Sequence, residues 1–473
     1  MKQLVFISNA IVIVLSTILI LFCDSTYNSS MQEFAILLPI FPMLLYFQQN
    51  SSVLALKGLY LRTSYIFILG YVIVFFQFNI DLVCHNITSH SAQFSSPSVI
   101  NKCLLYAVAG ICSYFLGNCM ALWKGFSISR NKTNRRIISS SFLKFQSILL
   151  FVFAIVYLYY NAREILSGNF IYSEDAMTEK AGSFSNYSSV MVYVLTFTYL
   201  VSRSFSNKSK GKFVSIWGFI KGNGFLFNLS ITLYLIFIFM TGDRGPIITI
   251  VLAYAITYVT ISKKKLKLVA IIAFIAVGSV GLTAIGEVRR TANILTVSEL
   301  LKYKSESDAQ SISPMTAELA GSYNTFTYAV DKVPDKYDFF YGLMQIRESV
   351  CAVPFLYRIV PFVFSSKEYE NSSTSYCTFL IQGLNRNYGN GSSILADFYL
   401  DYGYIGILVG MFFLGLVIVR LDNELFLGSN IYWQVAALVF FSNSLYISRA
   451  TLTTPLYYIV PALLIMYLHK FFK

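Results

Sequence analysis

The feature that most constrains this chain is a succession of long apolar runs separated by polar segments. Each run is about 17–22 residues long, which is enough for an α-helix to cross the hydrocarbon core of a bilayer. The runs do not alternate apolar and polar residues as the strands of a membrane β-barrel do. Only 12% of the 473 residues are charged, against roughly 25% in a soluble domain. The sequence therefore predicts an all-α protein, a polytopic transmembrane helical bundle.

About twelve spans are predicted, and ten or eleven remain compatible because the third and eleventh runs are short and somewhat polar. Pro39 and Pro42 make the second run the least regular. The first run is interpreted as a retained helix, since no small-residue cleavage site precedes Asp24. The runs are 4–22, 33–48, 64–80, 103–122, 142–161, 187–202, 224–240, 246–262, 268–286, 403–419, 431–447 and 453–469.

The distribution of charge predicts the orientation of these spans. If the N-terminus is cytoplasmic, the cytoplasmic segments hold 21 of the 36 basic residues and only two acidic residues, Asp422 and Glu424. The net charge is then +19 inside and −6 outside, which matches the excess of Lys and Arg expected in cytoplasmic loops. Both termini are therefore predicted to be cytoplasmic. The overall charge of +13 is attributed to topology and to contact with anionic membrane lipids, not to nucleic-acid binding.

The same topology divides the chain into three parts. Residues 1–286 form spans one to nine, and residues 403–473 form spans ten to twelve. Between them, residues 287–402 form one long outer loop, which is too apolar and aromatic to be disordered throughout. Its segment 337–364 is predicted to be an interfacial or re-entrant pair of helices, and its segment 369–390 a polar loop.

A six-residue hairpin, Thr241-Gly242-Asp243-Arg244-Gly245-Pro246, joins the seventh and eighth spans at the outer face. Its glycines and proline permit a tight turn. Ionisable groups at membrane depth are costly, so they tend to be paired or functional. Asp243 and Arg244 are therefore candidate site residues, with a turn that simply ends two helices as the alternative.

Further arginines are predicted on the outer face, where their planar forks would suit a lipid-linked phosphate or diphosphate. The alternative is that several of them pair with nearby acids such as Asp243, Glu287 and Glu348. Arg347 and Arg358 would share a helix face if Pro354 did not interrupt that helix. The full set is Arg244, Arg289, Arg290, Arg347, Arg358, Arg386 and Arg449.

The sequence predicts neither a metal nor a cofactor. The three histidines, His85, His90 and His469, all lie outside the long loop. No Ser/His/Asp arrangement can be assembled in the loop, and no His/Cys metal-binding spacing or Gly-rich nucleotide loop is found.

The Gly-x-Arg-Gly-Pro hairpin, the long late loop, the re-entry at residues 392–406 and Arg449 together resemble the O-antigen polymerases of the Wzy type. This resemblance implies a GT-C-like glycosyltransferase of the bacterial inner membrane, acting on its periplasmic side. The donor would be a glycan on undecaprenyl diphosphate, and the acceptor a lipid-linked repeat unit. Membrane lipids, a chain-length regulator and a flippase of the same pathway are the further partners that the resemblance suggests.

In such a reaction, arginines would stabilise the developing diphosphate charge, and a base would take the proton of the acceptor hydroxyl. Related enzymes place a histidine in the long loop, and this loop has none. Substrate-assisted proton loss or a carboxylate must replace it. The candidates are Asp243, Glu287, Glu348 and Asp397. A flippase or other exporter of lipid-linked oligosaccharides and an O-antigen ligase are the alternative functions.

Overall fold

The computed structural model describes most of the chain. The described residues are 2–23, 27–52, 61–84, 97–123, 138–166, 182–208, 215–241, 244–262, 312, 316–353, 356–364, 366–386, 389–428 and 430–472. Their regular elements are all helices, which confirms the predicted all-α fold.

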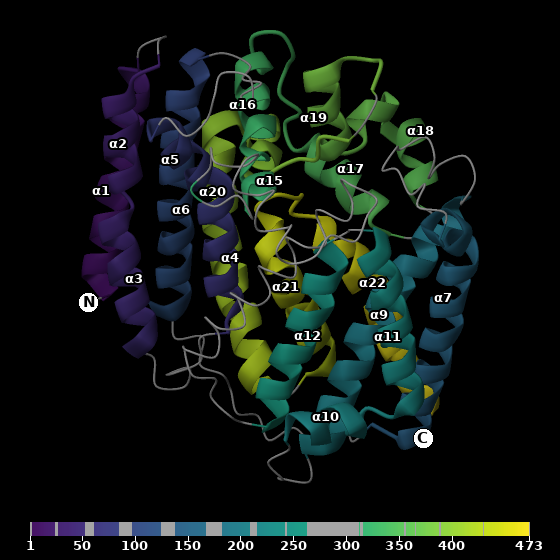
Figure 1. Ribbon diagram of the computed structural model, residues 1–473. Coiled ribbons are helices and arrows are strands. Elements are labelled where there is room, and N and C mark those ends of the chain that lie inside the picture. Colours follow the sequence, from purple (N-terminus) through teal and green to yellow (C-terminus); the bar gives the residue numbers. More distant parts are fainter. Residues whose placement is uncertain are drawn as a thin grey trace, which may run out of the picture.

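Most of the helices form a bundle whose long members run vertically in Figure 1. They are α1 (Lys2–Leu21), α2 (Ser29–Leu37), α3 (Ile40–Ser52), α4 (Thr63–Val72), α5 (Phe78–Val83), α6 (Pro97–Trp123), α7 (Ser140–Leu166), α9 (Gly182–Lys208), α10 (Ile216–Gly222), α11 (Phe225–Thr241), α12 (Arg244–Ser262), α20 (Ile394–Leu427), α21 (Ile431–Ile447) and α22 (Thr454–Leu468). A π-helical turn, η2 (Ile73–Gln77), joins α4 to α5.

Eleven of the predicted spans coincide with these helices, and the ninth, 268–286, lies outside the described residues. The break between α2 and α3 falls at Leu38 and Pro39, where the second span was expected to be irregular. By length and composition, seven helical segments among the described residues could cross a membrane, counting α2 with α3 as one and α4 with η2 and α5 as another. The number is eight if α10 and α11, bent by 102°, count as one. The helical membrane fold is confirmed, while the number of crossings stays a prediction.

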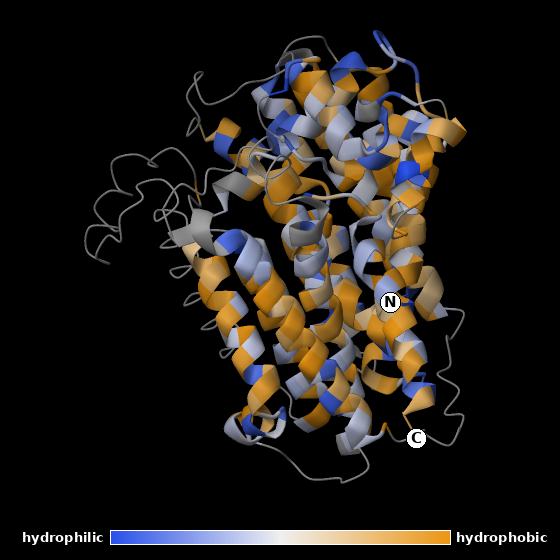
Figure 2. Cartoon of the chain, turned by 90° about the vertical axis from the view of Figure 1, so that its right-hand side faces the viewer, coloured by the Kyte–Doolittle hydropathy of each residue, from blue (hydrophilic) through white to orange (hydrophobic). Residues whose placement is uncertain are grey.

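A second group of helices lies at one end of the bundle, at the top of Figure 1. They are α15 (Ala317–Ala320), α16 (Tyr323–Lys332), α17 (Leu343–Cys351), α18 (Val360–Phe364) and α19 (Ser373–Gln382), with 3₁₀ turns η3 (Leu356–Arg358) and η4 (Glu368–Glu370). Hydrophilic residues are frequent at this end, and hydrophobic residues dominate the helices below it (Figure 2). We refer to this group of elements as the cap.

Helix α19 corrects the prediction that 369–390 is a polar loop. The segment is rich in Ser and Thr, but Cys377 and Leu380 are buried in the hydrophobic core. The Ser372 hydroxyl accepts a hydrogen bond from the Ser375 N–H and so caps the N-terminus of α19. The Ser372 hydrogen bond and the burial of these side chains against the core stabilise the helix.

Helix α20 connects the cap to the bundle. Its first two turns belong with the cap, because the Phe340 and Tyr341 N–H groups donate to the carbonyls of Leu400 and Asp401. The backbone breaks at Tyr402 and at Gly403, where φ is 61°, a left-handed conformation that favours glycine. The tenth span was predicted to begin at residue 403, and the kink lies at that point.

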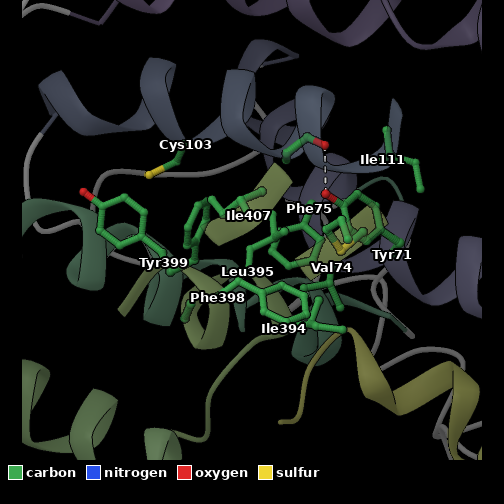
Figure 3. Packing of buried hydrophobic residues seen from close by; sticks show 14 of the residues in the cluster. Tyr71, Val74, Phe75, Cys103, Ile111, Ile394, Leu395, Phe398, Tyr399 and Ile407 are labelled. Carbon is green, nitrogen blue, oxygen red and sulfur yellow. Dashed lines mark hydrogen bonds between the residues drawn. The ribbon is translucent and has the colours of Figure 1, made fainter. Parts of the chain in front are cut away.

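Below the kink, α20 packs closely against α6. A Cβ atom on Gly117 would lie 2.0 Å from the Phe412 carbonyl oxygen, so only glycine permits this approach. Figure 3 shows the adjoining core, in which Leu395 and Ile407 of α20 face Tyr71 and Phe75. The Tyr71 hydroxyl donates to the Ala107 carbonyl at 2.8 Å. This packing gives the cap a rigid base.

Candidate functional site

Two buried carboxylates meet where α17, α19 and α20 converge. Glu348 on α17 is 1% exposed, and Asp397 in the first turn of α20 is fully buried. Ser373, the first residue of α19, joins them: its N–H donates to Glu348 Oε1 and its hydroxyl donates to Asp397 Oδ1. The structure therefore brings together two of the four predicted carboxylate candidates.

The turn between α21 and α22, residues 448–453, is hydrogen-bonded to the same two carboxylates. The Leu452 N–H donates to Asp397 Oδ2 at 2.8 Å, and the Thr453 hydroxyl donates to Glu348 Oε2 at 2.7 Å. The Ser392 hydroxyl adds a further bond to Asp397 Oδ1 at 3.1 Å. The carboxylate pair thus fixes the turn that carries Arg449, whose side chain is half-buried.

The environment of Glu348 changes its acidity. Burial raises the pKa of the Glu348 carboxyl, and the hydrogen bonds from Thr453 and Ser373 partly offset this rise. A carboxylate with a raised pKa binds a proton more readily than an exposed one. Glu348 is therefore better suited to accept a proton near neutral pH.

A third buried carboxylate, Asp401, holds the N-terminus of α17. Its Oδ1 accepts the N–H groups of Gly342 at 2.9 Å and Met344 at 3.2 Å, and its Oδ2 accepts that of Gln345 at 3.3 Å. These N–H groups have no partners within the helix, and a negative charge at this end is favourable. Asp401 therefore fixes the helix that carries Arg347 and Glu348.

Arg347 is 6% exposed, so it points into the cap. Its Nη1 contacts Glu370, at 3.3 Å from the carbonyl oxygen and 3.6 Å from Oε2. Its guanidinium also lies over the rings of Phe340 and Phe364, at 5.7 Å and 5.9 Å from their centroids. This arrangement gives Arg347 a structural part in tying α17 to the rest of the cap, whereas its predicted contact with substrate stays a prediction.

Arg358 lies in η3 and is exposed. Helix α17 ends at Cys351 and the two arginines belong to separate elements, so the expected interruption of a shared helix is confirmed. Arg386, after α19, is half-buried.

Arg244 is the first residue of α12 and is half-buried, and the predicted break between the two spans falls directly before it. Helix α11 leaves α10 at the lower end of Figure 1, so the α11–α12 junction faces the cap. The remaining candidates, Asp243, Glu287, Arg289 and Arg290, lie outside the described residues.

Sequence reasoning missed the hydroxyl residues of this site. Ser373 and Thr453 each donate to the carboxylate pair. The signal that could have indicated them is the run Thr451-Leu452-Thr453-Thr454. It places three hydroxyl residues in four positions at the junction of two apolar helices.

Comparison with known proteins gives one family match. The family described as O-antigen polysaccharide polymerase Wzy matches residues 4–473, which is nearly the whole chain. No curated protein and no solved structure matches it.

Proposed function

The chain belongs to the Wzy family of O-antigen polysaccharide polymerases, membrane proteins that polymerise lipid-linked repeat units, and we propose that it does so by glycosyl transfer on the periplasmic face of the inner membrane. The donor is a growing glycan on undecaprenyl diphosphate, and the acceptor is a single repeat unit on the same lipid. The reaction uses no metal and no cofactor. Both chain termini are cytoplasmic, and the cap is periplasmic.

This proposal rests on the hydrogen bonds that hold the 448–453 turn to buried carboxylates at the cap. Asp397 and Glu348 together accept hydrogen bonds from Leu452 and Thr453, so the Arg449 backbone is held against the cap. Catalysis by electrostatic stabilisation requires donors that are already in place when charge develops. A rigid arginine-bearing turn meets that requirement for a departing lipid diphosphate.

Arg244 is proposed as a second diphosphate ligand. It opens α12 on the side of the bundle that faces the cap, and Pro246 is the third residue of this helix. Its planar fork matches two phosphate oxygens at once, which a lysine ammonium cannot do. Arg358 is exposed on the cap surface and is proposed to contact the lipid-linked substrate as it approaches.

In the transfer step, the acceptor hydroxyl attacks the anomeric carbon of the donor glycan, and the bond to the diphosphate oxygen breaks. The electron pair leaves with the diphosphate, so negative charge grows there, and the arginines stabilise it. A flippase would not need this cleavage chemistry, and a ligase would transfer the glycan to lipid A. The family match favours the polymerase over both.

Substitution of Arg244 tests the diphosphate role. Loss of one donor to developing charge costs about 3–4 kcal/mol, or roughly 10²–10³ in rate. We expect Arg244→Lys to lose most long-chain glycan while the protein remains in the membrane at normal abundance. Arg420→Lys is the matched control, because Arg420 lies over the Trp433 ring at 4.9 Å, on the part of α20 remote from the cap.

A purely structural Arg244 gives a different result. Lysine would then preserve much of the polymer, and Arg244→Ala would lower protein abundance. Long-chain glycan and membrane protein level should be measured in the same cells for all three variants. Near-normal polymer in Arg244→Lys would remove Arg244 from the site.

A further inference from the structure

Three threonine hydroxyls form a chain that ends on the buried Glu348. Thr453 Oγ1 donates to Glu348 Oε2 at 2.7 Å. Thr451 Oγ1 lies 2.9 Å from Thr453 Oγ1 and 3.1 Å from Thr454 Oγ1. Exposure increases along the chain, because Thr453 is 2% exposed, Thr451 is 6% exposed and Thr454 is half-buried. The chain therefore leads from the buried carboxylate towards the surface.

The direction of these hydrogen bonds follows from the count of protons. A hydroxyl carries one proton, and that of Thr453 is given to Glu348. Thr451 therefore uses its own proton inwards, towards Thr453 or towards Glu348, with which its side chain also hydrogen-bonds. Thr454 must in turn be the donor to Thr451. All three bonds point towards the ionised carboxylate, and the Thr454 oxygen keeps a lone pair that can accept a proton from an incoming hydroxyl.

We propose that this chain carries the proton of the acceptor hydroxyl from Thr454 through Thr451 and Thr453 to Glu348; this inference rests on the proposed glycosyl transfer. The acceptor oxygen forms its bond to the anomeric carbon as the bond from that carbon to the diphosphate breaks. The acceptor proton moves to Thr454, and each threonine passes its own proton inwards. Glu348 becomes protonated, and the three hydrogen bonds reverse.

The surroundings of Glu348 suit a proton acceptor. The titratable groups that act on it, or that it acts on, are Asp397 from α20, Cys377 from α19, Tyr457 from α22 and Cys351 on its own helix. Burial raises the pKa of the Cys377 thiol to about 12, which keeps this thiol neutral. Burial also raises the pKa of Glu348, which strengthens the carboxylate as a base.

The geometry also explains how a buried residue can serve a substrate that it does not touch. Glu348 is 1% exposed, so an acceptor sugar has no direct access to its oxygens. Thr454 begins α22 and lies five positions after Arg449. An acceptor hydroxyl at Thr454 would lie directly after the turn whose arginine is proposed to bind the diphosphate.

The test removes one hydroxyl at a time without changing side-chain shape. Thr451→Val interrupts the chain at its centre, and Thr451→Ser restores a hydroxyl. Thr325→Val is the matched control, because Thr325 is 2% exposed in α16 and its hydroxyl donates only locally, to the Ser322 carbonyl at 2.8 Å. Thr451→Val removes two threonine–threonine hydrogen bonds and Thr325→Val removes one local hydrogen bond. Each neutral bond is worth about 1 kcal/mol, so the two variants should differ in stability by only about 1 kcal/mol.

Polymerisation is measured in membrane vesicles supplied with the lipid-linked repeat unit extracted from a strain that lacks this gene. In the wild type, kcat should rise as pH rises through the pKa of Glu348, since the ionised form accepts the proton. Thr451→Val should lower kcat by about 10²-fold or more, leave KM unchanged and remove this rise. Thr451→Ser and Thr325→Val should both behave like the wild type.

Each outcome decides a separate question. Wild-type kcat and an unchanged pH profile in Thr451→Val would overturn the proton chain while leaving the polymerase function intact. If wild-type vesicles make no polymer from the repeat unit, the proposed glycosyl transfer fails instead. If Thr451→Val does not accumulate in the membrane, Thr454→Val at the half-buried outer end decides the matter by the same criteria.

Discussion

The N-terminus of α17 depends on a carboxylate from another element, and replacing it gives the sharpest structural prediction. Asp401 accepts three N–H groups, from Gly342, Met344 and Gln345. In Asp401→Asn, the remaining side-chain oxygen can still accept the N–H groups of Gly342 and Met344. The new amide nitrogen then faces the Gln345 N–H, so two donors oppose each other. Helix α17, which carries Glu348, should lose its anchor.

The size of the effect follows from these contacts. A hydrogen bond to a charged group contributes about 1.5–3 kcal/mol, and a negative charge at a helix N-terminus contributes about 0.3–1 kcal/mol. The neutral asparagine side chain costs less to bury than the ionised carboxylate, and this difference offsets part of the lost interaction energy. We therefore expect a net loss of about 2–3 kcal/mol in the local stability of α17, or roughly a 30–150-fold shift in its opening equilibrium.

The assay is amide hydrogen exchange of the purified protein in detergent, followed by mass spectrometry of the peptides that cover α17. Asp422→Asn is the matched control, because Asp422 lies at the other end of α20 and accepts the N–H groups of Thr63 at 2.7 Å and Ser64 at 3.3 Å. This control should loosen the start of α4, leave α17 protected and preserve polymer formation. Asp401→Asn should speed exchange in α17 and reduce polymer. Unchanged exchange in α17 would refute the anchoring role of Asp401.

The remaining predictions concern the orientation of the chain. The charge split of +19 against −6 predicts that a phosphatase fused at Ser311 is active in the periplasm and that one fused at Ser209 is inactive; the reverse pattern would overturn the topology. A protease-sensitive tag placed after Lys473 should be cleaved in inverted inner-membrane vesicles and protected in intact spheroplasts, and cleavage in spheroplasts would contradict a cytoplasmic C-terminus.

Local sequence information predicted the bundle well. Hydrophobic length and the positions of proline act within one segment, so the α2–α3 break at Pro39 and the α11–α12 junction before Arg244 could be recognised. The kink at Gly403 also coincides with the predicted start of the tenth span. These features need no knowledge of which helices become neighbours.

The site could be predicted only in part, because tertiary contacts decide which residues meet. Glu348 and Asp397 were recognised as two of four candidate bases. Their hydrogen-bond partners were not, since Thr453 lies 105 residues from Glu348 along the chain. Arg347 was expected to lie on the outer face as a candidate phosphate ligand, and its burial beside Phe340 and Phe364 could not be predicted.

Helix α19 shows the same limit within the long loop. Its sequence contains many Ser and Thr residues, which favour turns as readily as helix ends. Burial of Cys377 and Leu380 against the core stabilises the helix, and that burial depends on elements distant in sequence. A hydroxyl-rich segment with a short apolar face is thus ambiguous until its neighbours are known.

The most direct test of the central claim is the surface glycan of a bacterium from which this gene is deleted. A polymerase acts after the repeat unit has crossed the membrane, so the account predicts lipid A core capped with a single repeat unit and no long-chain glycan. Restoring the wild-type gene should restore the long chains. Loss of even the single capped unit would contradict the account, because it would assign the protein to the crossing of the membrane, as a flippase, or to the transfer of the glycan to lipid A, as a ligase.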